Sequence, residues 1–239
     1  MVIEDRIKTY VERFDEVLKG GIPAGHIVLM CGSPGSYKSS ITLNLLARNA
    51  VESGKKGLYI TLEEPKESLL VTAKSIGMPS WTDDQLLIAD LGTMRMHHDA
   101  DGEEGWMRYM EDYIKKRVEE GTEIVVLDSL SALYSLYGFE NPRRELFRFF
   151  GFLRELGVTF ILISEVKKHD GPYSEYCEDF LSDGIIYLNN FSISDTESQL
   201  RIKCVKMRHV NHSKNFYTLM LDDGRFQIAR VISQRSGSF

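Results

Sequence analysis

A glycine-rich segment directly follows the apolar run of residues 27–30. Its sequence is Gly32-Ser33-Pro34-Gly35-Ser36-Tyr37-Lys38-Ser39. This order matches G-x-x-x-x-G-K-[ST], the phosphate-binding loop that follows a strand and opens a helix, except that Tyr37 replaces the second glycine. Backbone amides of such a loop and the positive end of the next helix bind phosphate oxygens. We therefore expect a nucleoside triphosphate with Mg²⁺ as the ligand.

The side chains of this loop have separate expected roles. Lys38 would reach the β- and γ-phosphates, and the Ser39 hydroxyl would ligate Mg²⁺. Gly32 and Gly35 permit a tight turn and close approach of the backbone. Further nucleotide-binding candidates are Ser33, Pro34, Ser36, Tyr37 and Ser40. Tyr37 adjoins the helix start, so we expect ordinary helical dihedrals, an outward ring and retained binding. The alternative is a weakened or nucleotide-free loop. An outward ring could also stack on a base or on a neighbouring subunit.

Acidic residues follow two other apolar runs. Asp128 ends the run of residues 124–127, and an apolar strand that ends in Asp downstream of a phosphate loop is typical of a Mg²⁺-binding position. Glu63 and Glu64 directly follow residues 58–62. A carboxylate there points into the ligand crevice of a parallel sheet and could orient the attacking water. Glu-Glu-Pro also suits the N-terminus of a solvated helix, so both interpretations stay open.

A basic pair lies late in the chain. Lys206 and Arg208 are two residues apart near the end of an expected strand, so they share one face. Two cations on one face suit phosphate recognition, and one could act on the γ-phosphate of another subunit. An exposed basic edge strand is the alternative. The histidines and aspartates of residues 97–101 are adjacent rather than at ligand spacing, so we expect a solvated loop there instead of a metal site.

Short apolar runs alternate with longer helical patterns along most of the chain. The runs are residues 26–32, 57–62, 85–90, 123–128 and 158–164, and the helical patterns are residues 38–53, 66–76, 104–119 and 141–156. Strands without helices follow at 183–188, 199–206, 216–221 and 225–231, with a hairpin turn at Asp222-Asp223-Gly224. Continuous apolar runs favour strands that are covered on both faces. We predict an α/β fold with a mainly parallel sheet, flanking helices and antiparallel C-terminal strands. Residues 94–105 should form a loop, and residues 234–239 a disordered tail.

Composition narrows the class of protein. The 239 residues fit one domain, and the net charge of −6 argues against a role dominated by nucleic-acid backbone contacts. Three widely separated cysteines favour buried free thiols in a reducing cytosol over a zinc site or a disulfide framework. We see no apolar signal core and no run that approaches the roughly 20 residues of a membrane span. A cytoplasmic location is expected.

The order of these motifs resembles the KaiC-like branch of the RecA superfamily of ATPases, from about Phe14 to Arg230. Residues 14–25 look like the lead-in to that family's phosphate loop, and residues 61–64 are similar to the strand end that carries its paired catalytic glutamates. Residues 171–183 resemble the segment before its sixth strand. Lys206, Arg208 and His212 match its K-x-R-x-x-x-H pattern, in which Lys and Arg contact the γ-phosphate bound by the adjacent subunit of a ring.

The resemblance implies a RecA-like P-loop NTPase core that spans residues 1–239 as a single domain, with a lead-in over about residues 1–25. It implies ATP and Mg²⁺ at the subunit interfaces of a homo-oligomer, often a hexamer. Glu63 and Glu64 would be catalytic, and Lys206 and Arg208 would act in trans. Tyr37 departs from the family pattern, which bears on the rate of hydrolysis more than on binding. The clock protein of this family has two such domains, so a circadian role is not carried over.

Three functions fit the sequence. The first is a slow ATPase, converting ATP and water to ADP and phosphate, whose nucleotide state switches self-assembly or binding of a protein partner. The second is a scaffold that binds nucleotide and barely hydrolyses it, similar to the RecA-like protein of archaeal motility filaments; Tyr37 favours it. The third is a DNA-recombination accessory, with DNA loops near residues 134–144 and 166–179. The first of these loops mixes aromatic and basic residues, but the second is not convincingly basic, so nucleic acid is not favoured.

Overall fold

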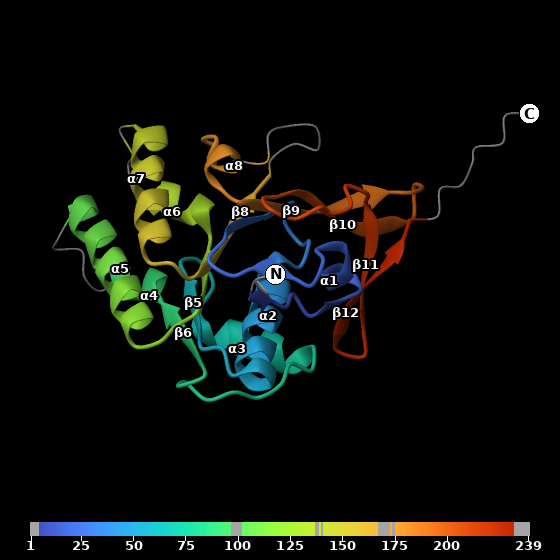
Figure 1. The fold of residues 1–239 in the computed structure, drawn as a ribbon, viewed down its shortest axis with the longest axis horizontal. Helices are drawn as coiled ribbons and strands as arrows, with labels where there is room; N and C mark the ends of the chain where they lie inside the picture. The colour runs from blue at the N-terminus through green and yellow to red at the C-terminus, as the bar shows by residue number, and fades with distance from the viewer. Residues whose placement is uncertain are drawn as a thin grey trace, which may run out of the picture.

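The computed structural model describes residues 5–96, 102–136, 139, 141–166, 173 and 175–231. Within these residues, ten strands form one sheet in the order β2-β12-β11-β10-β9-β4-β8-β7-β5-β6, and β1 pairs with β3 outside it. Helices flank the parallel part of the sheet, and β10 to β12 extend it at the other end (Figure 1). The predicted α/β architecture is therefore confirmed.

Six neighbouring strands run parallel to one another at the centre. They are β4 (Ile27–Gly32), β5 (Gly57–Thr61), β6 (Leu86–Asp90), β7 (Ile124–Asp128), β8 (Thr159–Glu165) and β9 (Gly184–Ser192). Five of them match the predicted runs closely. The sequence pattern grouped β9 with the antiparallel strands, but β9 is parallel to β4 and antiparallel only to β10. Because β8 ends at Glu165 and β9 begins at Gly184, the sequence between them is long enough for a parallel crossover.

Two apolar layers cover this sheet. On one face, α2 (Lys38–Ser53) and α3 (Lys66–Ser75) pack on side chains such as Val28 and Tyr59. On the other, α5 (Gly102–Glu119), α6 (Leu130–Leu136) and α7 (Pro142–Glu155) pack on side chains such as Leu29 and Leu127. Because both faces are covered, strand residues on either side must be apolar, which produces the continuous runs.

Local signals define the helix ends. Gly54 adopts a left-handed conformation at the C-terminus of α2, where glycine carries no Cβ penalty. At the N-terminus of α7, the Asn141 side chain accepts a hydrogen bond from the Arg144 amide, and Pro142 occupies the first turn. Met110 and Ile114, four residues apart on α5, are buried and form part of its apolar face.

The C-terminal strands form an antiparallel extension of the sheet. They are β10 (Ser198–Met207), β11 (Tyr217–Asp222) and β12 (Arg225–Arg230). The hairpin turn predicted at Asp222-Asp223-Gly224 is present, with Asp222 at the end of β11 and positive φ at Asp223 and Gly224. The N-terminal segment contributes β1 (Arg6–Ile7), β2 (Val11–Glu12), α1 (Phe14–Val17) and β3 (Ile22–Pro23). Its β2 runs parallel to β12 and covers that edge of the sheet.

The loop predicted for residues 94–105 is wrong at both ends. Helix α4 (Leu91–Met96) extends into it, and α5 already begins at Gly102. Packing of Trp106 in the core outweighs the weak helix propensity of the two glycines before it. The histidine segment 97–101 and the predicted disordered tail lie outside the described residues. No helix in the described ranges is long and apolar enough to cross a membrane.

The three cysteines are free thiols, but they are not alike. Cys31 and Cys204 are buried as expected, and burial raises the pKa of the Cys204 thiol to about 12. Cys177 is exposed, so the expectation of a buried thiol is wrong at this position. It directly precedes the short helix α8 (Glu178–Leu181) and has a left-handed backbone conformation.

Candidate functional site

Four neighbouring parallel strands, β4, β8, β7 and β5, end at the same edge of the sheet. The residues at and after these ends line one pocket of about 500 Å³. The lining consists of Pro34, Gly35, Ser36, Tyr37, Lys38, Ser39, Ser40, Glu63, Asp128, Ser129, Ile163 and Glu165. Three motifs that lie far apart in the sequence thus meet in one cavity. Of the predicted loop residues, Gly32 and Ser33 lie outside the lining, as does Glu64.

The Lys38 side chain is turned onto its own loop. Its Nζ donates to the carbonyl oxygens of Gly32 at 3.1 Å and Ser33 at 2.9 Å. Burial lowers the pKa of the Lys38 ammonium, and the carboxylates of Glu165 and Asp128 oppose that shift. A buried cation at the wall of an open pocket, between acidic groups, can exchange a carbonyl for a phosphate oxygen.

The loop is closed by contacts of its own residues. A Cβ on Gly32 would lie 2.2 Å from the carbonyl oxygen of Leu188, so glycine is required where the chain leaves β4. The Ser36 hydroxyl donates to the Ser33 carbonyl oxygen at 2.7 Å. Gly35 has a φ of 72° and open space beside it. These contacts give the loop the shape of a phosphate cradle.

Tyr37 does not adopt the helical dihedrals that we predicted. It has φ 62° and ψ 22°, a left-handed conformation immediately before α2. The loop geometry demands a glycine-like turn at this point, and the tertiary fold imposes that turn on a tyrosine. The outward ring is confirmed, because the side chain is 45% exposed and packs edge-to-face on Phe226 of β12.

Replacement of Tyr37 should separate backbone strain from ring packing. Tyr37→Gly relieves the left-handed strain and loses the Phe226 contact, whereas Tyr37→Ala only loses the contact. We expect the Gly variant to be more stable than the Ala variant by about 1 kcal/mol in urea unfolding. Equal stability of the two variants would show that the backbone is not left-handed here in solution.

Asp128 lies at the end of β7 and is almost completely buried. Its Oδ2 accepts a hydrogen bond from the Tyr59 hydroxyl at 2.5 Å, and the Ser39 hydroxyl lies close enough to affect the pKa of its carboxylate. Burial raises the pKa of the Asp128 carboxyl. The hydroxyls of Tyr59 and Ser39 and the positive charge of Lys38 act in the opposite direction. Ser39 and Asp128, the two predicted Mg²⁺ ligands, are thus adjacent.

The two glutamates after β5 differ in their surroundings. Glu63 lines the pocket, and its Oε2 accepts a hydrogen bond from the Ser129 hydroxyl at 3.0 Å. Glu64 instead accepts a hydrogen bond from the Ser68 hydroxyl in the first turn of α3. The two interpretations of Glu-Glu-Pro thus divide between the residues: Glu63 faces the pocket, and Glu64 contacts the helix start.

Sequence reasoning missed three residues of this site. Glu165 ends β8 as Asp128 ends β7, so the same strand-end rule could have found it. Ser129 was visible only as the residue after Asp128. Tyr59 lies inside an apolar run, where its hydroxyl gave no signal until the fold placed it beside Asp128.

These residues fit a nucleotide with Mg²⁺. The Ser33 hydroxyl is buried without a hydrogen-bond partner among the described residues, and the first amides of α2 have no intrahelical acceptor. In the described part of the chain, no three His, Cys, Asp or Glu side chains are grouped as metal ligands. Mg²⁺ at ATP sites is held by few protein oxygens together with the phosphates, so Ser39 and Asp128 suffice.

Comparison with known proteins agrees with this geometry. The family model described as "ATPase: KaiC" matches residues 7–232. The chain belongs to the KaiC family of ATPases. A solved KaiC-like protein from the archaeon Pyrococcus horikoshii is 25% identical, with a TM-score of 0.77, and the match covers 95% of this chain and 99% of that one. The sheet with its flanking helices is therefore a RecA-like fold.

The curated KaiC relatives are longer. The circadian clock oscillator protein KaiC of Synechococcus elongatus is 26% identical across 98% of this chain and 46% of its own length. KaiC 1 of a Synechocystis strain is 29% identical across 98% of this chain and 46% of its own length. The chain spans about half the length of these relatives, so the activities of the whole clock proteins do not transfer by similarity alone.

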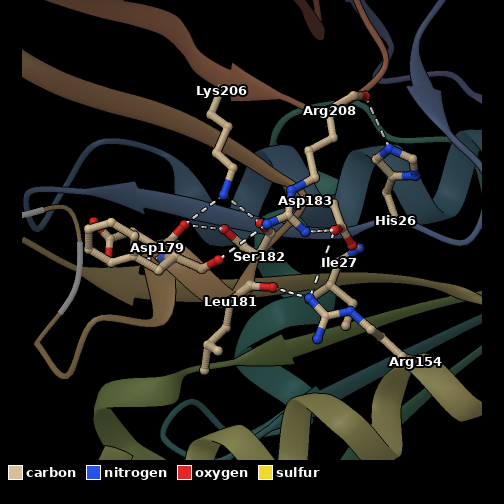
Figure 2. A network of polar contacts seen from close by, with 10 residues as sticks. His26, Ile27, Arg154, Asp179, Leu181, Ser182, Asp183, Lys206 and Arg208 are labelled. Atoms are coloured by element: carbon tan, nitrogen blue, oxygen red, sulfur yellow. Dashed lines mark hydrogen bonds and ion pairs between the residues drawn. The ribbon is translucent and has the colours of Figure 1, made fainter.

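The KaiC-type basic pair lies outside the pocket lining of its own chain. Lys206 Nζ donates to the carbonyl oxygens of Asp179 at 2.9 Å and Ser182 at 2.7 Å. Arg208, just past the end of β10, donates to Asp183 Oδ1 at 2.6 Å. Both cations point at the turn that follows α8, where Arg154 of α7 approaches from the other side (Figure 2). The two side chains point to the same side, as predicted. Their action on a neighbouring subunit stays a prediction.

Asp183 holds this network together. Its Oδ1 accepts from Arg208, and its Oδ2 accepts from the Ile27 amide at 3.0 Å, which ties the network to the start of β4. We expect Asp183→Ala to lower the free energy of unfolding by about 2 kcal/mol, since two donors lose a charged acceptor. Urea unfolding measures this loss in the free energy of unfolding. Asp195→Ala removes the same charge from an exposed turn and is the control. Equal losses for both variants would contradict this role of Asp183.

The two segments compared with DNA-binding loops are only partly described. The Tyr134 ring packs against Phe139 and Tyr176, and its hydroxyl donates to Glu178. Burial raises the pKa of Tyr134, so the hydroxyl keeps its proton. This side chain is used for internal packing and is not presented to a base. Residues 167–172 of the second segment lie outside the described ranges.

Proposed function

We propose that this chain binds ATP with Mg²⁺, hydrolyses it slowly, and uses its nucleotide state to control self-assembly or binding of a protein partner. The observation that carries the proposal is the convergence of Lys38, Ser39, Asp128 and Glu63 on one pocket. Membership of the KaiC family of ATPases supports ATP as the nucleotide. We place this activity in the cytoplasm.

The residues around the pocket divide the chemistry between them. The amides at the start of α2 and the Lys38 ammonium would bind phosphate oxygens. Mg²⁺ held by Ser39 and Asp128 would neutralise charge on the phosphates. Glu63 would orient the attacking water and accept its proton, and Glu64 would support Glu63 from the next position. Catalysis would come from positioning and electrostatic stabilisation.

Self-assembly would complete the site. Lys206 and Arg208 lie outside the pocket lining of their own chain, so they would reach the γ-phosphate bound by a neighbouring copy in a ring, as a hexamer allows. Charge complementarity supports this arrangement: the pocket carries Glu63, Asp128 and Glu165, whereas the basic pair lies outside its lining.

A scaffold that binds ATP but barely hydrolyses it is the second candidate. Tyr37 favours it, because a left-handed tyrosine with its ring packed on Phe226 holds the loop in one shape. A rigid loop can still bind phosphates through its amides. It adapts less well to the charge that develops during hydrolysis.

One experiment separates these candidates. Particle mass is measured with and without ATP·Mg²⁺, starting from the 27.4 kDa monomer, while phosphate release is followed in the same sample. ATP-dependent growth with release selects the switch, and growth without release selects the scaffold. If calorimetry detects no binding of ATP with Mg²⁺ at any protein concentration, both candidates are excluded. Single-stranded DNA at low salt tests the recombination accessory, which requires binding or faster turnover.

A further inference from the structure

The hydroxyl of Tyr59 points at the proposed metal site from inside the core. Tyr59 lies on β5, and its ring is fully buried against the face that α2 covers. The register of β5 with β7 pairs Tyr59 with Val126 and Thr61 with Asp128, so all four side chains lie on one face. The phenol therefore extends along the sheet toward the end of β7.

The polar contacts of this hydroxyl belong to the site. It donates to Asp128 Oδ2 at 2.5 Å, and the hydroxyls of Ser39 and Thr42, in the first turns of α2, are close enough to affect its pKa. Phenylalanine would fill the same core volume without burying a polar group. Burial of the tyrosine hydroxyl is therefore explained by its hydrogen bond to the Asp128 carboxylate.

We propose that Tyr59 is a positioning residue that sets how strongly the site binds a divalent cation. This inference rests on the proposed function, since it needs Asp128 and Ser39 to hold Mg²⁺ with ATP. The torsion that orients an aspartate carboxylate has a broad energy minimum, so a free carboxylate samples many orientations. The hydrogen bond from Tyr59 fixes Oδ2 in the core and leaves the remaining coordination to the Ser39 side.

Partners one step behind a metal ligand typically change metal affinity by 10- to 100-fold when they are removed. We therefore expect Tyr59→Phe to raise the Mg²⁺ concentration that half-saturates the ATP complex by roughly tenfold. Affinity for ATP in EDTA should stay unchanged, because Lys38 and the loop amides bind the phosphates without metal. Loss of core packing alone would weaken both.

The test uses the full chain and calorimetry. ATP is titrated into protein in EDTA, and Mg²⁺ or Mn²⁺ is titrated into protein with ATP. The Mn²⁺ titration is repeated by electron paramagnetic resonance. Tyr187→Phe, which also removes a buried tyrosine hydroxyl but on β9, is the control and should behave as wild type. If Tyr59→Phe folds poorly, fluorotyrosine at position 59 keeps the ring and its hydroxyl but changes the strength of the hydrogen bond to Asp128. It should change the Mg²⁺ titration and leave ATP binding in EDTA unchanged.

The outcomes separate the two claims. If the wild type binds no ATP, the proposed function fails and this inference fails with it. If the wild type binds ATP with Mg²⁺ and the Tyr59 variants have an unchanged Mg²⁺ requirement, the inference alone is overturned. Equal weakening with and without metal also overturns it, since that result indicates a structural role.

Discussion

Lys38→Ala should abolish phosphate release and weaken ATP binding by about 100-fold. The Lys38 ammonium is the buried cation at the pocket wall, and a hydrogen bond to a charged group contributes roughly 1.5–3 kcal/mol, which alone is 10- to 100-fold in affinity. A phosphate accepts more than one such bond, so the upper end of this range applies. Calorimetry with ATP·Mg²⁺ measures the affinity.

Lys74→Ala is the matched control for this prediction. Lys74 is an exposed lysine near the end of α3, so its removal makes the same change in net charge away from the pocket. We expect binding and turnover of this variant to equal those of the wild type. Wild-type affinity in Lys38→Ala would mean that the loop does not bind phosphate through its lysine.

Glu63→Gln should lower the rate of phosphate release by about 100-fold or more while ATP binding is retained. A positioned general base typically contributes 10²- to 10⁴-fold, and glutamine keeps the shape of the side chain without its basicity. Glu63 lines the pocket and is oriented by the Ser129 hydroxyl. Single-turnover phosphate release and calorimetry, measured side by side, separate catalysis from binding.

Glu64→Gln provides the comparison on the neighbouring residue. Its carboxylate contacts Ser68 and lies outside the pocket lining, so we expect a much smaller loss of rate, since it acts through Glu63. If release is abolished by Lys38→Ala but unchanged by Glu63→Gln, the role assigned to Glu63 is wrong. A larger effect of Glu64 than of Glu63 would reverse the assignment.

The resemblance to the KaiC family was visible in the sequence because its motifs are local. A phosphate loop needs glycines, a lysine and a hydroxyl at fixed spacing, and each of these can be read from residues 32–39. Central strands covered on both faces produce continuous apolar runs, which is why β4, β5, β7 and β8 were found with nearly correct ends. The Asp223-Gly224 turn was predictable for the same reason, since its backbone conformation demands those residue types.

Other features depended on contacts between distant segments. The direction of β9 could not be read from its own residues, because pairing with β4 decides it. The left-handed backbone of Tyr37 is imposed by the loop around it, against the preference of the residue. The different surroundings of Glu63 and Glu64 also could not be predicted, because they depend on hydrogen bonds to Ser129 and Ser68 in the folded chain.

The sequence by itself determined the family, and it predicted the ligand class and the residues that would bind phosphate, since each depends on short-range spacing. Only the tertiary structure decided which side chains share the pocket. The order β4-β8-β7-β5 brings the loop, Glu165, Asp128 and Glu63 to one edge and sets Tyr59 behind Asp128. Strand order follows from packing both faces of the sheet at once, and that constraint involves the whole chain.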